Sequence, residues 1–279
     1  MVVERVTKIQ TQSDFSDTGF LIVKDAISKN FLLDIQLAIY NLLNNSEEQN
    51  MSEGEIYSNF CQKVSCLKTS EYEFTKPIYD FLLYKEYLSK ILLEEKLYSA
   101  LTNLLGKDLS FCTDPSITLN LPNKDSPEKN YLFKDWHQEI WSGAGTSSVQ
   151  IWTPILHENS KEGQMAIILE SHKWGHIPHR NRKPIDLPEN YETAELNLEY
   201  GDVIIFSTLL MHRSRPTNSP RLSLPVQLDN FRYNYVSNNR STRNWKIFSY
   251  SEVTKIEKML GNHYLSPYRT CESDVKFET

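Results

Sequence analysis

Near Asp108 the sequence changes from one kind of periodicity to another, and few folds accommodate both. Before this point, apolar residues recur at intervals of three and four, which is the spacing of amphipathic helices. After it, short runs rich in β-branched and aromatic residues alternate with Pro, Gly, Asn and Ser, which is typical of strands joined by turns. We therefore predict a mainly β protein with flanking helices, in which a sandwich or jelly-roll core is buttressed by the N-terminal helices.

The same patterns place the elements approximately. Helices are predicted over 28–45 and 76–105, and the polar segments 44–55 and 123–130 are predicted loops. Strands are predicted over 116–121, 147–155, 164–169, 202–206 and 221–228. We expect one domain over 1–279, with a helical buttress over about 28–106, a β core over about 108–233 and a C-terminal helical extension over about 246–260.

Charge and composition exclude several classes of protein. Thirty basic residues against 36 acidic ones give a net charge of -6, so no general attraction to nucleic acid or to an anionic membrane is expected. No apolar run approaches the ~20 residues needed to cross a bilayer, and the first residues lack the apolar stretch of a secretory signal. The four cysteines are too few and too unevenly spaced for a disulfide framework or a four-thiolate metal site. We therefore expect a cytoplasmic protein that acts on a small molecule.

One short segment carries residues that are able to bind a metal. In Asp135-Trp-His-Gln-Glu-Ile-Trp, His137 and Glu139 are two positions apart, and a strand would send both side chains to the same face. The best third ligand is His212, which ends the apolar run after Gly201-Asp202. Two histidines and one carboxylate on one face of an octahedron bind Fe(II) and leave three positions open for a cosubstrate and O2. These three residues are therefore predicted to form both the metal site and the catalytic centre.

A site for a carboxylate is predicted shortly after His212. Arg221 and Ser223 are also two positions apart, so a guanidinium and a hydroxyl can share one face of a strand, and Ser214 can add a second hydroxyl. The segment 213–246 contains seven basic residues and one acidic residue, within a protein whose net charge is negative. An anionic cosubstrate is the simplest reason for this concentration of positive charge.

These motifs resemble those of the phytanoyl-CoA dioxygenase-like family of Fe(II)/2-oxoglutarate-dependent oxygenases. The resemblance covers about 15–233, and its opening segment, 15–23, is the weakest part. It is carried by the segments Trp136-His-Gln-Glu, Gly163-Gln-Met-Ala-Ile-Ile-Leu-Glu-Ser-His-Lys-Trp-Gly, Gly201-Asp202 followed by His212, and His212-x-Ser214 followed by Arg221. It implies a double-stranded β-helix, which is the cupin-like form of the jelly roll, with iron bound by the three predicted ligands.

The resemblance also implies the reaction and the cosubstrate site. The family's arginine, here Arg221, holds the distal carboxylate of 2-oxoglutarate, assisted by the serine two positions beyond the second histidine, here Ser214. Trp152 lies where the family often places a residue beside the cosubstrate. Oxidation of 2-oxoglutarate by O2 to succinate and CO2 is then coupled to hydroxylation of a substrate C–H bond. Fe(II), 2-oxoglutarate and O2 are therefore the expected cofactor and cosubstrates.

Two positions depart from the family's pattern. Glu139 stands where the family usually has Asp, which makes this ligand one methylene longer. Arg213 follows the second histidine where a small residue is common, and we predict it as a contact for an anionic substrate, together with Trp141 and Lys173. Because iron halogenases of this fold give up the carboxylate ligand, its presence favours hydroxylation over halogenation.

Other interpretations stay open at the level of sequence. The spacing of His172, His176 and His179 permits a zinc site, although an irregular turn is expected there. The three predicted metal ligands would also serve a cupin-like zinc or nickel isomerase or hydrolase, or they would be retained in a non-catalytic ligand-binding jelly-roll protein. Substrate specificity is expected to depend on loops without a readable motif, over 46–68, 123–134 and 173–196.

Overall fold

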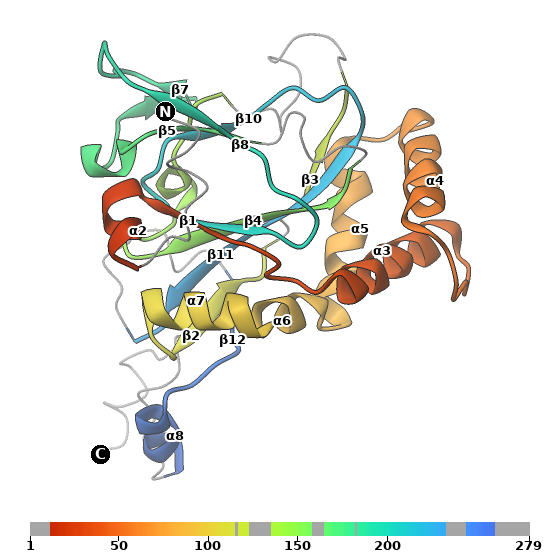
Figure 1. Cartoon of the computed structure of the whole chain (residues 1–279), viewed down its shortest axis with the longest axis horizontal. Coiled ribbons are helices and arrows are strands. Elements are labelled where there is room, and N and C mark those ends of the chain that lie inside the picture. The colour runs from red at the N-terminus through yellow and green to blue at the C-terminus, as the bar shows by residue number, and fades with distance from the viewer. Residues whose placement is uncertain are drawn as a thin grey trace, which may run out of the picture.

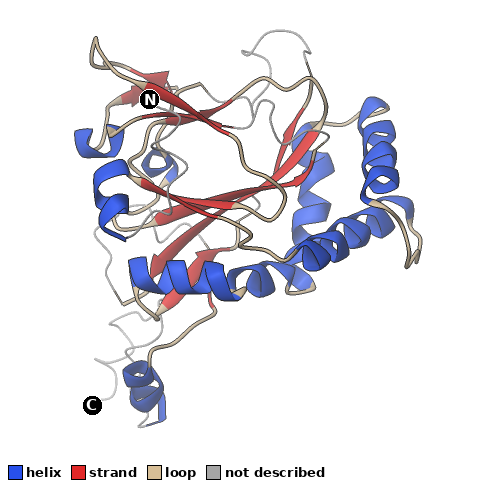
Figure 2. Ribbon diagram, in the orientation of Figure 1, coloured by secondary structure: helices blue, strands red, loops and turns tan. Residues whose placement is uncertain are grey.

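The computed structural model describes residues 12–114, 117–122, 135–157, 165–181, 183–232 and 244–259, and its centre is a pair of antiparallel sheets with helices along one side (Figures 1 and 2). The helices are α2 (Gln12–Thr18), α3 (Lys29–Asn44), α4 (Glu53–Ser65), α5 (Glu71–Tyr84), α6 (Tyr87–Leu92), α7 (Glu95–Leu105) and α8 (Glu252–Met259), with the 3-10 helices η1 (Glu139–Ser142) and η2 (Ser171–Trp174). The strands are β1 (Phe20–Val23), β2 (Leu109–Cys112), β3 (Thr118–Asn120), β4 (Val149–Leu156), β5 (Met165–Ile168), β6 (His179–Arg180), β7 (Lys183–Pro184), β8 (Thr193–Leu196), β9 (Val203–Ser207), β10 (His212–Ser214), β11 (Arg221–Asn230) and β12 (Trp245–Ile247).

The two sheets form a jelly roll. The larger sheet has the strand order β1-β9-β4-β11-β2-β12, with β3 also paired with β11, and the smaller sheet has the order β10-β5-β8. All pairings between the described strands are antiparallel. An apolar cluster lies between the sheets, with Ile204 and Phe206 from the larger sheet and Met165 and Ile167 from the smaller one. The predicted fold class, a mainly β jelly roll with flanking helices, is confirmed.

The helices cover one face of the larger sheet (Figure 1). Helix α3 packs against β4, α5 against β3 and α7 against β1. Helix α3 begins close to the predicted position because the side chain of Ser28 accepts a hydrogen bond from the backbone N–H of Phe31, and it ends at Asn45, which adopts the left-handed conformation. None of the described helices is both long enough and apolar enough to span a membrane.

The helical region differs from the prediction in two places. The segment 76–105, predicted as one helix, is divided among α5, α6 and α7. Glu86, which adopts a left-handed conformation with φ of 62°, separates α5 from α6, and Glu94, with ψ of 130°, separates α6 from α7. Helix α4 lies within the predicted loop 46–68. It begins with a capping box in which the side chains of Ser52 and Glu55 each accept a hydrogen bond from the other residue's backbone N–H. The capping box is a sequence signal for the start of a helix, but the polar residues around it obscure the 3.6-residue period of apolar positions.

Side chains along β11 alternate between two environments, because successive residues of a strand point to opposite faces. The residues on the helix side are aliphatic and belong to the main core: Leu222, Leu224, Val226 and Leu228. The residues on the opposite side include buried polar groups: Arg221, Ser223, Gln227 and Asp229. The neighbouring strand β4 alternates in the same way, since Ile151 joins the helix-side core and Trp152 joins the cluster between the sheets. One face of the larger sheet therefore stabilises the fold, and the other offers polar groups to the interior of the jelly roll.

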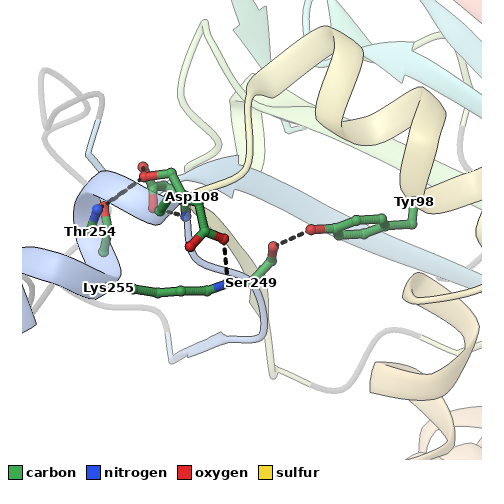
Figure 3. A network of polar contacts seen from close by, with 7 residues as sticks. Tyr98, Asp108, Ser249, Thr254 and Lys255 are labelled. Carbon is green, nitrogen blue, oxygen red and sulfur yellow. Dashed lines mark hydrogen bonds and ion pairs between the residues drawn. The ribbon is translucent and has the colours of Figure 1, made fainter.

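The C-terminal segment, predicted as helix over about 246–260, is a strand followed by a helix. Strand β12 pairs with β2 at the edge of the larger sheet, and α8 follows it. Ser251, just before α8, donates hydrogen bonds to Asp108 from its backbone N–H (2.8 Å) and its hydroxyl (2.9 Å). The hydroxyls of Ser249 and Tyr98 lie 2.7 Å apart in the same network (Figure 3). These polar contacts fasten the segment after β12 to α7 and to the start of β2.

The Gly201-Asp202 motif has a structural role at the start of β9. Gly201 has φ of +92°, and a Cβ at this position would lie 2.5 Å from the carbonyl O of Ile27, so only glycine fits without displacing the backbone. The carboxylate of Asp202 accepts hydrogen bonds from the backbone N–H groups of Asp25 (3.1 Å) and Glu199 (3.0 Å). The motif thereby joins β9 to the connection between β1 and α3.

Candidate metal centre

The structure brings together His137, Glu139 and His212, which the sequence predicts as metal ligands. Oε1 of Glu139 lies 3.4 Å from Nε2 of His137 and 3.3 Å from Nε2 of His212. One potential ligand atom from each residue lies within 4.8 Å of the others. All three residues are buried. Two imidazoles and one carboxylate in a buried cluster form a donor set that suits Fe(II).

Two backbone features align these residues. His137 and His212 form an isolated antiparallel bridge, in which the N–H of each donates to the carbonyl of the other at 3.0 and 3.1 Å. Gln138 is extended, but Glu139 is the first residue of η1 and not a strand residue as predicted, because pairing with β10 stops at the bridge. The hydroxyl of Ser142, at the end of η1, donates to Oε2 of Glu139 at 3.2 Å. A bridge followed by a tight turn thus presents the two side chains that the sequence placed on one strand.

Backbone carbonyl groups orient both imidazoles. Nδ1 of His137 lies 2.8 Å from the carbonyl O of Asp135, and Nδ1 of His212 lies 2.9 Å from that of Leu210. Because a carbonyl oxygen only accepts, each Nδ1 carries a proton, and Nε2 is the ring nitrogen left to bind a metal. The two histidines are therefore held in the tautomer that a metal requires. These carbonyl partners have no sequence signal, since any residue type supplies a backbone carbonyl.

Arg221, the predicted anchor for a carboxylate, is 1% exposed at the start of β11. Its guanidinium carbon lies 5.5 Å from the centre of the Trp152 ring. Burial lowers the pKa of Arg221 to about 10, because loss of water disfavours the charged form, and the group still remains protonated at neutral pH. The hydroxyl of Ser223, on the same face of β11, is buried and has no hydrogen-bond partner among the described residues. A buried cation beside such a hydroxyl is suited to an anionic ligand.

The metal-ligand cluster and Arg221 border one interior region. Trp152 belongs to the apolar cluster between the sheets, and so does Phe206. The ring centre of Phe206 lies 4.6 Å from that of His212. Ser214, two residues beyond His212 on β10, is half-buried on the same side of that strand. Phe206, which contacts the metal ligand His212 predicted from the sequence, and Trp152, which lies beside Arg221, therefore belong to the same cluster between the sheets.

Two glutamines that the sequence analysis did not single out face the same space. Gln150 on β4 pairs with Gln227 on β11 and, on its other side, with Phe206 on β9. The three residues form a row across the larger sheet beside His212, and both amides are buried. The alternation of a buried amide with apolar residues in Val149-Gln-Ile is the signal by which this polar wall was detectable.

Two of the predicted substrate contacts lie on the outer side of the molecule. Arg213 follows His212 on β10, so its side chain points to the opposite face, where its guanidinium carbon lies 4.5 Å from the centre of the Trp136 ring. Nζ of Lys173 lies 3.5 Å from a carboxylate oxygen of Glu170, and both side chains are exposed. Packing on an aromatic ring and ion pairing at the surface account for both positions, and a substrate role for them stays a prediction.

The three histidines considered for zinc have other contacts. Nε2 of His172 lies 2.9 Å from the carbonyl O of Ser16. The ring of His179 stacks on Trp141, the third predicted substrate contact, with the ring centres 4.5 Å apart. The rings of His176 and His179 are 6.4 Å apart. In the described parts of the chain, closely grouped metal donors are found at the site of His137 and not among these histidines.

The predicted specificity loops are described only in part. The segment 123–134 lies outside the described residues, and 173–196 contains the hairpin β6–β7 and strand β8. Of the basic residues that suggested an anionic partner, Arg215 forms an ion pair with Glu195, and Lys246 lies 3.4 Å from Glu86. Part of the local positive charge is therefore neutralised at the surface.

A jelly roll with a buried group of two histidines and one carboxylate is typical of non-haem Fe(II) oxygenases. The family model described as phytanoyl-CoA dioxygenase (PhyH) matches residues 15–223, which is most of the chain. The chain belongs to the phytanoyl-CoA dioxygenase family. No curated protein matches it.

Several solved structures share the fold at low sequence identity. The apo form of the non-haem monooxygenase ThoJ has a TM-score of 0.57 and 15% identity, covering 91% of this chain and 93% of that one. The apo form of EctD from S. alaskensis has a TM-score of 0.51 and 15% identity, covering 81% and 78%. SnoN, a non-haem α-ketoglutarate-dependent epimerase from nogalamycin biosynthesis, has a TM-score of 0.50 and 14% identity, covering 82% and 81%. These similarities concern the fold.

Proposed function

We propose that this protein is a non-haem Fe(II)- and 2-oxoglutarate-dependent dioxygenase that hydroxylates a small polar or anionic metabolite. The observation that carries the proposal is the convergence of His137, Glu139 and His212, with both histidines held in the metal-binding tautomer. Membership of the phytanoyl-CoA dioxygenase family supports the same reaction class. Iron bound by these residues would supply O2 activation coupled to oxidative decarboxylation of 2-oxoglutarate, with release of succinate and CO2.

Arg221 is proposed to hold the distal carboxylate of 2-oxoglutarate. Its guanidinium is buried, stays charged at neutral pH and shares a strand face with the Ser223 hydroxyl. A guanidinium fork bonds both oxygens of a carboxylate, and a hydroxyl adds a third hydrogen bond. Trp152 would lie along the cosubstrate, because its ring adjoins the Arg221 guanidinium. Ser214, on the metal side of the space, is the second proposed hydroxyl contact.

The substrate is proposed to enter the space walled by Gln150 and Gln227, beside the metal ligands. Buried amides offer both hydrogen-bond donors and acceptors, so this wall favours a substrate with hydrogen-bonding groups over a purely apolar one. Glu139 supplies the third proposed protein ligand, the carboxylate, and its presence supports hydroxylation over halogenation. An isomerase or hydrolase that uses the same ligands has no use for Arg221 or for O2.

The test is succinate formation from 2-oxoglutarate by the purified protein under air with Fe(II) and ascorbate, across a panel of polar and anionic metabolites. We expect slow release of succinate without a substrate, faster release with a substrate, and a product that gains one oxygen atom by mass spectrometry. Absence of succinate under every condition would contradict the proposal. Anaerobic Fe(II) and 2-oxoglutarate should also give a weak metal-to-ligand charge-transfer absorption, which a non-catalytic scaffold would lack.

A further inference from the structure

Gln138 lies between the two proposed ligands His137 and Glu139 in the sequence, but its side chain points in a different direction from theirs. The residue is extended, with φ of -112° and ψ of 144°, so its side chain points away from the side taken by His137. It is 1% exposed. A buried carboxamide needs partners for two donor hydrogens and an acceptor oxygen, so its contacts show what it holds in place.

The amide group of Gln138 bonds backbone groups from two other segments. Nε2 donates to the carbonyl O of Leu209 at 2.6 Å and to that of Gly175 at 2.8 Å. Oε1 accepts from the backbone N–H of Ile177 at 2.9 Å. Both donors and the acceptor are used, and reversing the amide would place like groups together, so its orientation is fixed.

These partners adjoin the metal-ligand cluster. Leu209 lies in the turn between β9 and β10, and the next residue, Leu210, supplies the carbonyl that orients the imidazole of His212. The N–H of Ile140 donates to the carbonyl of Thr208 in the same turn at 3.1 Å. Gln138 therefore ties the segment that carries two proposed ligands to the turn that orients the third.

The second partner segment is the loop after η2. Its Ile177 is held on both sides, because its N–H bonds Gln138 and its carbonyl accepts the indole N–H of Trp141 at 2.8 Å. Trp141 is the last but one residue of η1, which begins at Glu139. Gln138 and Trp141 thus both bond Ile177, and these contacts hold the loop after η2 against the segment that contains His137 and Glu139.

We propose that Gln138 is a positioning residue for the metal centre, which holds the His137–Glu139 segment, the turn before His212 and the loop at Gly175–Ile177 in one arrangement. The inference rests on the proposed function, since it requires that His137, Glu139 and His212 bind a metal. Groups that fix the geometry of ligands without touching the metal affect metal affinity by about 10- to 100-fold. Gln138 acts through its neighbours and does not contact the metal.

The experiment measures Co(II) binding by the full chain, with Co(II) used as an O2-insensitive probe whose visible spectrum reports ligand geometry. Gln138→Leu removes the three hydrogen bonds and should raise the Co(II) dissociation constant by about 10- to 100-fold and alter the visible bands. Gln138→Met, which keeps the length of the side chain, is the second variant if the first does not fold. Thermal melting of the metal-free proteins records the loss of stability separately.

Gln36→Leu is the matched control. Gln36 is also 1% exposed, and from α3 it donates a buried hydrogen bond at 2.7 Å to the carbonyl of Ile155 on β4, on the helix-covered side of the larger sheet. This variant should lower the melting temperature but leave the Co(II) dissociation constant within about 2-fold of wild type, because no bond near the ligands changes. If the Gln138 variants bind Co(II) as tightly as Gln36→Leu does, with an unchanged spectrum, the positioning role is wrong.

Glu139→Ala separates this inference from the proposed function. If the wild type fails to bind Co(II), or if Glu139→Ala binds it as tightly as the wild type, the metal centre itself is wrong and both proposals fall. If the wild type binds Co(II), Glu139→Ala loses it and the Gln138 variants keep it, the inference about Gln138 alone is overturned.

Discussion

The two faces of β11 carry different kinds of residue at the same depth of burial. Leu222 and Leu224 face the helices and join the main apolar core, whereas Arg221 and Ser223 are equally buried but face the space between the sheets. On the helix side, burial removes apolar surface from water and stabilises the fold. On the other side, burial lowers the pKa of Arg221 to about 10, which shows that the fold disfavours its charge. The comparison indicates that the face on the helix side stabilises the fold, whereas the inner face, toward the space between the sheets, carries polar groups at a cost in stability.

The largest expected effect is on the inner side, from Glu139→Ala. Removal of the carboxylate leaves only two of the three proposed ligands, so we expect succinate formation to fall to background while the melting temperature stays close to that of the wild type. Succinate assays and thermal melting measure the two quantities. Glu170→Ala, which removes an exposed carboxylate beside Lys173, is the control and should keep full activity. Wild-type-like succinate release by Glu139→Ala would remove this carboxylate from the site.

The next effect is on the helix side, from Leu224→Ala. Leu224 is fully buried in the main core, so truncation should cost about 2–5 kcal/mol of the free energy of unfolding through lost contacts and a cavity. Urea denaturation measures this cost, and the folded fraction should keep its KM for 2-oxoglutarate. Ser223→Ala, one residue away on the other face, should change stability by less than about 1 kcal/mol. Equal losses of the free energy of unfolding in the two variants would contradict the proposed difference between the faces.

Arg221→Met tests whether the inner face of β11 binds the cosubstrate. Loss of charged hydrogen bonds to the cosubstrate should raise the KM for 2-oxoglutarate by about 10- to 100-fold. Stability should change little, because a lowered pKa of a cationic group means that its charged form is penalised in the fold, and this penalty is fully present at pH values below about 10. Arg221→Lys keeps the charge without the fork and should give a smaller rise in KM. An unchanged KM in both variants would place the cosubstrate elsewhere.

The smallest effect is expected in the network that fastens the C-terminal segment. Tyr98→Phe removes the hydroxyl that lies 2.7 Å from that of Ser249 and should cost about 0.5–1.5 kcal/mol of the free energy of unfolding, with activity unchanged. Chemical denaturation provides the measurement, and Tyr84→Phe, at a residue 82% exposed, is the control that should show no change. A loss of succinate formation in Tyr98→Phe would show that this network communicates with the metal centre.

Local patterns predicted the strands β3, β4, β5, β9 and β11 and the start of α3, because each depends on the period of a few neighbouring residues or on one cap such as Ser28. The same approach missed α4 and merged α5, α6 and α7, since polar surroundings hid the period of α4 and a left-handed residue such as Glu86 has no reliable sequence signal. It also placed β12 in a helix, because three residues, Trp245–Ile247, are too few for a period, and their pairing with β2 is a long-range contact.

By itself, the sequence determined the chemistry available at the site. The types and order of His137, Glu139, His212 and Arg221 specify a donor set suited to a metal, followed by a guanidinium, and these are properties of covalent structure. The tertiary structure alone decided which carbonyls fix the tautomers of the histidines, that Arg213 points outward, and that Gln150 and Gln227 form a wall beside the ligands. The physical reason is that strand register and turn geometry arise from contacts between distant segments, which the local spacing of residues does not encode.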